Sequence, residues 1–175
     1  MILSPVQGLN SRITQKFGND FKINGKWVYK SMGMDGHNGI DYGVPVGTPI
    51  YASHDGEVVK AVKSNVGYGN HIKLRSRYYA RETVYGHLSK LNVQAGQTVA
   101  MGDLIGWSGG AKGAPGSGLS TGPHLHHGYR NLIPSDKPLA QWTVKDYDNG
   151  YFGYIDVSEY TVEWEGTHTS SWYAI

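Results

Sequence analysis

Short runs rich in Val, Ile, Tyr and Thr, separated by glycine, form the main hydrophobic and polar pattern of this chain. Short runs of this kind, bounded by turn residues, are typical of β-strands. The predicted strands are 12–15, 49–52, 56–62, 71–75, 82–87, 97–99, 104–107 and 124–129. No long stretch has helical periodicity, and a single helical turn is predicted for 88–91. Because the connections are too short for helical crossovers, the pattern predicts a mostly β, antiparallel fold.

The pattern changes twice along the chain. Residues 109–122, rich in glycine with Ser and one proline, predict a loop that leads into the strand at 124–129. After Pro134 the regular spacing of glycines gives way to Tyr, Trp, Asp and Thr. We therefore predict one domain over 1–134 and a Tyr- and Trp-rich C-terminal extension over 135–175, which is packed on the domain or has an unknown role.

Composition narrows the possible functions. At 175 residues the chain is long enough for one domain with a substantial core. It contains no cysteine, so any metal must be held by nitrogen and oxygen atoms. The formal net charge is only +2 and the Lys and Arg residues are scattered, which argues against a nucleic-acid surface. No segment approaches the roughly 20 apolar residues of a membrane helix, and no signal peptide is visible.

Candidate chemistry lies in two short motifs. The first, HNGID, contains His37 and Asp41, and the second, GPHLH, contains His124 and His126. Two imidazoles and one carboxylate make a three-ligand set that suits zinc and leaves one coordination position for water. The remaining imidazole is then available for proton transfer. This set of residues predicts a metallohydrolase.

The spacing within each motif predicts how these side chains point. In an extended strand, side chains two positions apart share a face, so His124 and His126 project together while Leu125 points into the opposite layer. His37 and Asp41 are four apart and share one face of a strand or of a helix. The glycine between them and the β-branched residue that follows it favour the strand. Both pairs are therefore predicted to converge on one point from different strands.

Further motifs complete a specific series. They are HNGIDY (37–42), PVGTPI (45–50), DGEVV (55–59), GYGN (67–70), YGHLS (85–89) and STGPHLH (120–126). In this order and at these intervals, the chain from about Ser4 to Ile133 resembles the M23 zinc endopeptidases, the lysostaphin-like or LytM-type peptidoglycan hydrolases. The resemblance implies a compact antiparallel β-sheet or sandwich of the LytM-like, barrel-sandwich hybrid type, with a substrate groove across the sheet.

The resemblance also implies roles for individual residues. His37, Asp41 and His126 would ligate one Zn²⁺ ion, while His87 and His124 would line the catalytic water and the scissile carbonyl. The zinc would lower the pKa of its bound water to roughly 7 and polarise the carbonyl. One of the two remaining histidines would act as general base. The sequence leaves open which of the two it is.

One position departs from the pattern of the family. The last motif often continues as His-Phe-Glu, whereas this chain has His126, His127 and Gly128. By strand alternation His127 faces away from His126, so it is not expected to replace it as a ligand. The missing Glu affects a supporting or packing contact rather than the metal set.

Residues outside the motifs receive structural interpretations. His54, His71 and His168 are expected to be packed or surface histidines, and Asp55 with the glycine after it is interpreted as a hairpin turn. Two alternatives, groove wall or packing, hold for Tyr42, Tyr68, Tyr85 and Trp107. The tail aromatics form either a wall-binding patch or edge packing, and they include Trp142, Trp164 and Trp172.

Two other classes of function are weighed against hydrolysis. A non-catalytic LytM-like wall-binding scaffold or regulator is expected to lack ligands, yet every expected ligand is present. A carrier domain is suggested by residues 93–106, which resemble a hairpin of barrel-sandwich carriers, a similarity of fold more than of function. A lipoyl-type carrier needs a lysine at the hairpin tip, and residues 100–102 contain none.

The favoured interpretation is a zinc endopeptidase that hydrolyses peptide bonds in the cross-bridges or stem peptides of bacterial peptidoglycan. It would act at the cell wall, as an extracellular or virion-associated enzyme. We expect a monomer that neither binds nucleic acid nor inserts into a membrane. A bacteriophage-type lysin (an antimicrobial endolysin) or a processed fragment of a longer enzyme fits these expectations.

Overall fold

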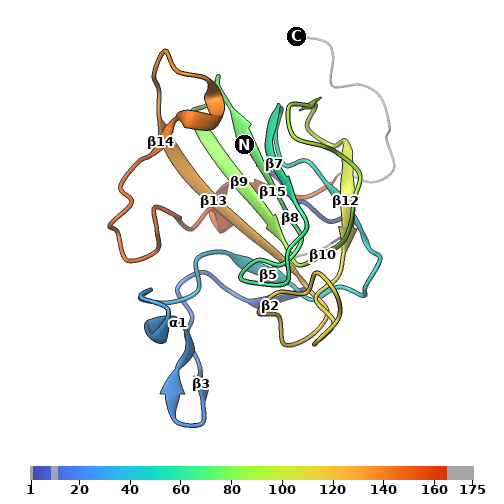
Figure 1. Ribbon diagram of the computed structural model, residues 1–175, viewed down its shortest axis with the longest axis vertical. Coiled ribbons are helices and arrows are strands. Elements are labelled where there is room, and N and C mark those ends of the chain that lie inside the picture. The colour runs from blue at the N-terminus through green and yellow to red at the C-terminus, as the bar shows by residue number, and fades with distance from the viewer. Residues whose placement is uncertain (1, 9–11, 165–175) are drawn as a thin grey trace.

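The computed structural model describes residues 2–8 and 12–164, and strands dominate this part of the chain (Figure 1). In chain order the elements are β1 (Ile2–Leu3), β2 (Ile13–Gln15), β3 (Lys22–Ile23), β4 (Lys26–Trp27), α1 (Val28–Ser31), β5 (Ile40–Tyr42), β6 (Pro49–Tyr51), β7 (Gly56–Val62), β8 (His71–Ser76), β9 (Arg81–Gly86), β10 (Leu88–Leu91), β11 (Thr98–Val99), β12 (Leu104–Ser108), β13 (Leu125–Ile133), the 3₁₀-helix η2 (Leu139–Gln141), β14 (Thr143–Val144), the 3₁₀-helix η3 (Ser158–Tyr160) and β15 (Thr161–Val162).

The largest sheet carries most of the strands that the glycine-separated pattern predicts. Its order is β11-β7-β8-β9-β13-β5-β2, and β14 adds to one end of β13. Every pair within it is antiparallel. The connections are short, and short connections join antiparallel rather than parallel neighbours. The prediction of a mostly β, antiparallel fold is confirmed.

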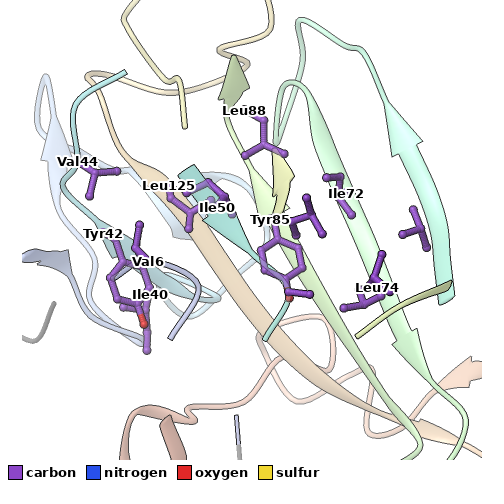
Figure 2. Packing of buried hydrophobic residues seen from close by; sticks show 14 residues of the cluster. Val6, Ile40, Tyr42, Val44, Ile50, Ile72, Leu74, Tyr85, Leu88 and Leu125 are labelled. Atoms are coloured by element: carbon purple, nitrogen blue, oxygen red, sulfur yellow. The ribbon is translucent and has the colours of Figure 1, made fainter. Parts of the chain in front are cut away.

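A smaller sheet of order β10-β12-β6 packs against one face of the large sheet. Figure 2 shows the shared core, which contains Ile72 and Tyr85 of the large sheet and Ile50 and Leu88 of the small one. The fully buried or nearly buried members of this core are Val6, Ile40, Tyr42, Val44, Ile50, Ala52, Val58, Ile72, Leu74, Tyr85, Leu88, Val99, Ile105 and Leu125. Two sheets that bury a common apolar layer form a sandwich, as the predicted fold class requires.

Successive side chains of β13 alternate between the shared core and the opposite face of the sheet. Leu125 is buried in the shared core, and the next side chain, His126, points to the other face. His127 returns to the core side, where its Nε2 lies 3.1 Å from the hydroxyl of Ser53. The predicted alternation along this strand is therefore confirmed, and His127 does face away from His126.

Residues Leu88–Leu91 form strand β10, so the predicted helical turn is wrong. Leu88 is buried in the core, while Lys90 pairs with Trp107 of β12 and places its ammonium 4.7 Å from the indole ring. Pairing with a neighbouring strand and burial of Leu88 outweigh the weak local preference of this short stretch.

The hydrophobic pattern also does not predict the small elements between β2 and β5. Strands β3 and β4 form a hairpin closed by Asn24 and Gly25, both with positive φ, and the short helix α1 follows. Asn-Gly is the preferred pair for the two-residue turn that suits a hairpin. Figure 1 shows this hairpin projecting from the main body of the protein.

Two strands of the C-terminal extension pair with earlier parts of the chain. β14 pairs with β13 in the large sheet, and β15 pairs in parallel with β1 in a separate two-stranded sheet. The Arg75 guanidinium donates hydrogen bonds to the carbonyls of Leu139 and Trp142. The domain boundary after residue 134 stays a prediction, and His168 and Trp172 lie outside the described residues. No helix in the described ranges is long and apolar enough to cross a membrane.

Candidate metal centre

Sheet register places the first two candidate ligands beside each other. Asp41 in β5 is the direct antiparallel partner of His126 in β13. Side chains that face each other across neighbouring strands lie on the same side of the sheet. Asp41 Oδ1 consequently lies 3.0 Å from His126 Nδ1, although the two residues are 85 positions apart in the chain.

His37 approaches the same point from an irregular segment rather than from a strand. β5 begins only at Ile40, so the prediction that His37 and Asp41 share one strand is wrong for His37. Two backbone hydrogen bonds fix His37 instead: its N–H donates to Asn19 (2.8 Å) and its carbonyl accepts from Gly18 (2.8 Å). These bonds hold the segment against the chain that leaves β2.

The three candidate ligand atoms form a nearly equilateral triangle. His37 Nε2 lies 3.0 Å from Asp41 Oδ1 and 3.0 Å from His126 Nδ1, and the third side is the 3.0 Å contact between Asp41 and His126. Tetrahedral zinc with bonds of about 2.0–2.1 Å spaces neighbouring ligand atoms by roughly 3.3 Å. All three residues are buried. The structure therefore brings together His37, Asp41 and His126 in a geometry that suits one metal ion.

A hydrogen bond on the far side of the ring sets the tautomer of His37. Its Nδ1 lies 3.2 Å from the Lys16 carbonyl, which can only accept a hydrogen bond. In the neutral ring Nδ1 therefore carries the proton, and Nε2 presents a lone pair toward Asp41 and His126. This is the protonation state that a metal ligand requires.

The carboxylate of Asp41 is kept ionised. Burial by itself would raise its pKa, but hydrogen bonds with His126 and His37 outweigh this effect and hold the pKa far below its ordinary value. An ionised carboxylate is an acceptor on both oxygens and a good ligand for zinc.

His87 and His124 stand together beside the triangle. Their ring centroids are 4.7 Å apart, and His124 Nε2 lies 3.6 Å from the second oxygen of Asp41. His87 Nδ1 donates to the Ser117 carbonyl (2.8 Å), and His124 Nδ1 donates to the Gly122 carbonyl (2.8 Å). In both neutral rings the unprotonated nitrogen is thus Nε2.

The environment favours the neutral form of His87. Burial, followed by the proximity of His126 and His124, lowers the pKa of His87 to about 3. His87 sits just after β9 with a φ of 60°, a left-handed conformation that directs the chain from β9 into β10. At pH 7 the ring is therefore neutral, and its Nε2 atom is a hydrogen-bond acceptor.

A cleft of about 540 Å³ opens over these five residues. Gly67, Tyr68, Leu119, Ser120 and Thr121 line it from one set of loops. The other lining residues come from β2, from the chain between β2 and β5, which includes α1, and from the C-terminal extension: Gln15, Phe21, Ile23, Val28, Tyr29, Met32, Met34, Asn38 and Phe152. A groove beside the candidate centre, as the resemblance implies, is present.

Several cleft residues are missed by sequence reasoning. Tyr29 places its ring 5.3 Å from that of His37, and its hydroxyl donates to Gln15 Oε1. Asn38 donates to the Tyr68 hydroxyl. The Asn-Gly turn was a signal for the hairpin that carries Tyr29 to this position, whereas nothing local marks the contacts of Asn38.

Two other described histidines, His54 and His71, and the aspartate Asp55 lie outside the candidate metal centre. His54 is buried between the Asp55 carbonyl and the Thr83 hydroxyl, and His71 binds the Gly69 carbonyl, so both are packed histidines as predicted. Asp55 does not form a hairpin turn, because the strands on either side of it belong to different sheets.

Among the four aromatic residues considered as groove walls, Tyr68 lines the cleft and stacks on His126 at 5.1 Å. Tyr42 and Tyr85 belong to the core. Trp107 lies on β12, where Lys90 covers its ring. In the tail, Trp142 is buried against Leu132 and Leu139, and Trp164 packs on Tyr51, so the edge-packing alternative holds for these two.

Comparison with known proteins adds independent information. The sequence model of Peptidase family M23 matches residues 35–140. Glycyl-glycine endopeptidase ALE-1 of Staphylococcus capitis is 43% identical over 97 residues, which are 54% of this chain and 25% of that protein. Peptidoglycan DD-endopeptidase ShyA of Vibrio cholerae is 42% identical over 105 residues, which are 59% of this chain and 21% of that protein.

A solved structure shares the fold. The antimicrobial peptidase lysostaphin from Staphylococcus simulans superposes with a TM-score of 0.59 at 31% identity, over 88% of this chain and 51% of that one. The matched region therefore spans about a quarter or less of the two sequence relatives and about half of this structural one.

Proposed function

The chain belongs to peptidase family M23, and on that premise we propose that it is a zinc-dependent endopeptidase that cleaves peptide bonds in bacterial peptidoglycan. The observation that carries the proposal is the buried triangle of His37, Asp41 and His126 on the floor of an open cleft. Three nitrogen and oxygen ligands with a free side toward solvent are typical of catalytic rather than structural zinc sites.

The residues fit a zinc ion on chemical grounds. An ionised carboxylate and a lone pair on His37 Nε2 face one point, and His126 Nδ1 completes the set at matching distances. His126 Nδ1 is free to bind a metal when its proton resides on Nε2, a buried atom that has no hydrogen-bond partner among the residues that the structure describes. When bound, zinc supplies Lewis-acid polarisation of a carbonyl and lowers the pKa of a water molecule.

We assign proton transfer to His87 and His124. Each ring is oriented by a carbonyl that accepts from Nδ1, which leaves Nε2 as the proton acceptor next to the candidate ligands. One of the two takes a proton from the attacking water, and the pair stabilises the oxyanion or delivers a proton to the leaving amine. In the cleft wall beside them, Asn38 donates a hydrogen bond to the Tyr68 hydroxyl, and the Tyr68 ring stacks on His126.

The relatives indicate the substrate class. One is a glycyl-glycine endopeptidase and another a peptidoglycan DD-endopeptidase, so the proposed substrates are peptide cross-bridges or stem peptides of the wall. We propose that the protein works as a monomer at the cell wall, without nucleic acid and without insertion into a membrane. A bacteriophage origin stays a prediction.

The proposal is tested by digestion of purified cell walls that differ in cross-bridge chemistry. The protein is assayed as prepared, after chelation and dialysis, and after one equivalent of zinc is returned. We expect new amino termini, identified by mass spectrometry, in the first and third samples but not in the second. Zinc should also raise the melting temperature of the chelated protein, because a ligand that binds only the folded state stabilises it.

Two results would contradict the proposal. Hydrolysis that is indifferent to chelation would exclude the metal centre as its cause. Zinc binding and wall binding without any cleavage would instead favour a non-catalytic scaffold.

A further inference from the structure

The hairpin segment, residues 20–34, is a part of the cleft that the M23 match does not include. It comprises β3, β4, α1 and the residues that flank them. Figure 1 shows it standing apart from the two packed sheets, on the side of β2 and β5. The family match therefore assigns no role to these residues.

The base of the hairpin segment is closed by one carboxylate. Asp20 accepts hydrogen bonds from the backbone N–H groups of Phe21 (2.8 Å) and Tyr29 (3.1 Å). Val28 donates to the Phe21 carbonyl at 2.9 Å. Since isolated two-stranded hairpins are only marginally stable in water, these contacts fix the position of the strands.

The two faces of the hairpin differ in character. Lys22 and Trp27 are direct partners on one face, where the Lys22 ammonium lies 4.7 Å from the Trp27 ring. Ile23 and its direct partner Lys26 lie on the other face, and Ile23 lines the cleft together with Phe21 and Val28. Within the described chain Phe21 is still 37% exposed and Ile23 50% exposed.

The apolar face continues toward the candidate metal centre. Met32 and Met34 line the same cleft, and the ring of Tyr29 lies 5.3 Å from that of His37. Just before the hairpin segment, Gly18 and Asn19 are tied to the backbone of His37, just after it, by two hydrogen bonds of 2.8 Å. A group bound against this face therefore occupies a fixed position relative to the candidate ligands.

We propose that the hairpin segment forms an apolar subsite that selects substrates with an aliphatic side chain next to the scissile bond, through Phe21, Ile23 and Val28. This inference rests on the proposed peptidase function and adds a preference to it. A glycine residue offers this face nothing to cover it, whereas an alanine or valine side chain would remove exposed apolar surface from water on both partners.

The expected size of the preference is measurable. One or a few methylene groups in an apolar pocket change kcat/KM by about tenfold or more. Zinc-loaded protein is therefore assayed on capped pentaglycine and on matched pentapeptides that carry one alanine or valine, in L or D form, at each position in turn. At one position we expect valine to raise kcat/KM by about tenfold over pentaglycine.

Variants on the two faces of the hairpin locate the effect. The double variant Phe21→Ser/Ile23→Ser should bring the valine-to-glycine ratio of kcat/KM close to one, through a loss of about tenfold on the valine peptide. The matched control is Trp27→Ser, which removes an exposed aromatic ring from the opposite face and should keep the wild-type ratio. Zinc content and melting temperature are compared for all three proteins.

The outcomes separate this inference from the proposed function. A wild-type ratio of one or less, an unchanged ratio in the double variant, or an equal loss in Trp27→Ser would overturn the subsite. If no peptide is hydrolysed, the digestion of cell walls still decides the proposed function, and calorimetric binding of the same peptides decides the subsite alone. Tighter binding of the valine peptide that the double variant loses would support it, and equal binding of both peptides would refute it.

Discussion

At the scale of single residues, the candidate centre depends on protons placed by backbone carbonyls. Lys16, Ser117 and Gly122 each accept a hydrogen bond from the Nδ1 atom of one histidine, and this leaves the Nε2 atoms unprotonated in the cleft. Contacts of this kind orient metal ligands and catalytic groups, and their loss weakens metal binding or activity. Sequence motifs name the histidines but do not reveal these acceptors.

The two histidines outside the metal triangle should separate binding from catalysis. We expect His87→Ala and His124→Ala to keep a full equivalent of zinc while turnover falls by about 10²–10⁴-fold, because general acid–base catalysis contributes about that much. Zinc content by atomic absorption and initial rates on purified walls test this. The control is His71→Ala, because His71 is half-buried and hydrogen-bonded to a loop carbonyl away from the candidate centre. Near-normal turnover in either variant would remove that residue from the mechanism.

Gly39 should be intolerant of any side chain. A Cβ atom there would lie 2.6 Å from His126 Cε1 and 2.7 Å from the His127 carbonyl oxygen. Because Gly39→Ala must displace the His126 ring, we expect zinc affinity to fall by at least about tenfold. A competition assay with a zinc indicator measures this. Gly122→Ala is the matched control, since its Cβ would meet nothing within 4 Å; an equal loss there would contradict the steric argument.

At the scale of elements, register in the large sheet brings the site together. Asp41 faces His126 because β5 and β13 are direct neighbours, and β9 on the other side of β13 delivers His87. A shift of one residue in either pairing would turn Asp41 or His126 toward the core. The strands also carry a buried ion cluster on β8, β9 and β13, in which Glu82 binds Arg75 and Arg130.

Removal of the charge of Glu82 should destabilise this sheet strongly. Burial raises the pKa of the Glu82 carboxyl, but Lys73, Arg130 and Arg75 together hold it below its ordinary value, so the group is ionised. We expect Glu82→Gln to reduce the free energy of unfolding by about 3–5 kcal/mol, because buried cations lose their partner. Urea denaturation of the zinc-free protein measures it. The exposed Glu159→Gln should change it by less than about 0.5 kcal/mol, and equal effects would show that burial is not the cause.

At the scale of the whole molecule, the C-terminal extension and the two sheets form one packed unit in the described ranges. The Arg75 guanidinium joins both Glu82 and the carbonyls of Leu139 and Trp142, so the ion cluster inside the sheet also anchors the extension. Ile2, Tyr129 and Val157 form a further apolar cluster that includes both ends of the described chain. The free energy of unfolding of this whole unit should therefore depend on the charges of its buried groups.

Acid should weaken the folded state through His54. Burial lowers the pKa of His54 to about 4, below the ordinary 6.5. Between these two pH values the unfolded chain binds more protons at His54 than the folded chain does. The stability that the neutral His54 contributes is therefore fully present above pH 6.5 and is lost as the pH falls toward 4. This single group accounts for about 3 kcal/mol of that loss.

The measurement is a series of urea titrations of chelated protein between pH 7 and pH 4. His54→Gln, which does not titrate in this range, should lose less stability across the series than the wild type. Parallel pH profiles for the two proteins would show that His54 does not carry the effect.

Much of this protein is determined by its sequence alone. Glycine-separated, β-branched runs specify most of the strands of both sheets, because the period of two and the turn residues are local properties. The motif series likewise identifies the donor types of the candidate centre and the direction of His126 and His127 along β13. Strand Leu88–Leu91 and the hairpin at Asn24 were not predicted, since short segments take their conformation from the partners that they meet.

Only the tertiary structure decided how the distant residues meet. His37 and His126 are 89 positions apart, yet their nitrogens lie 3.0 Å from each other. His37 reaches that point from an irregular segment fixed by Gly18 and Asn19, and the apolar wall of the cleft comes from a hairpin segment whose position beside His37 no motif marks. Residue types and local periodicity are written in the chain itself, whereas strand order, register and loop contacts arise from long-range pairing and burial, which depend on every segment at once.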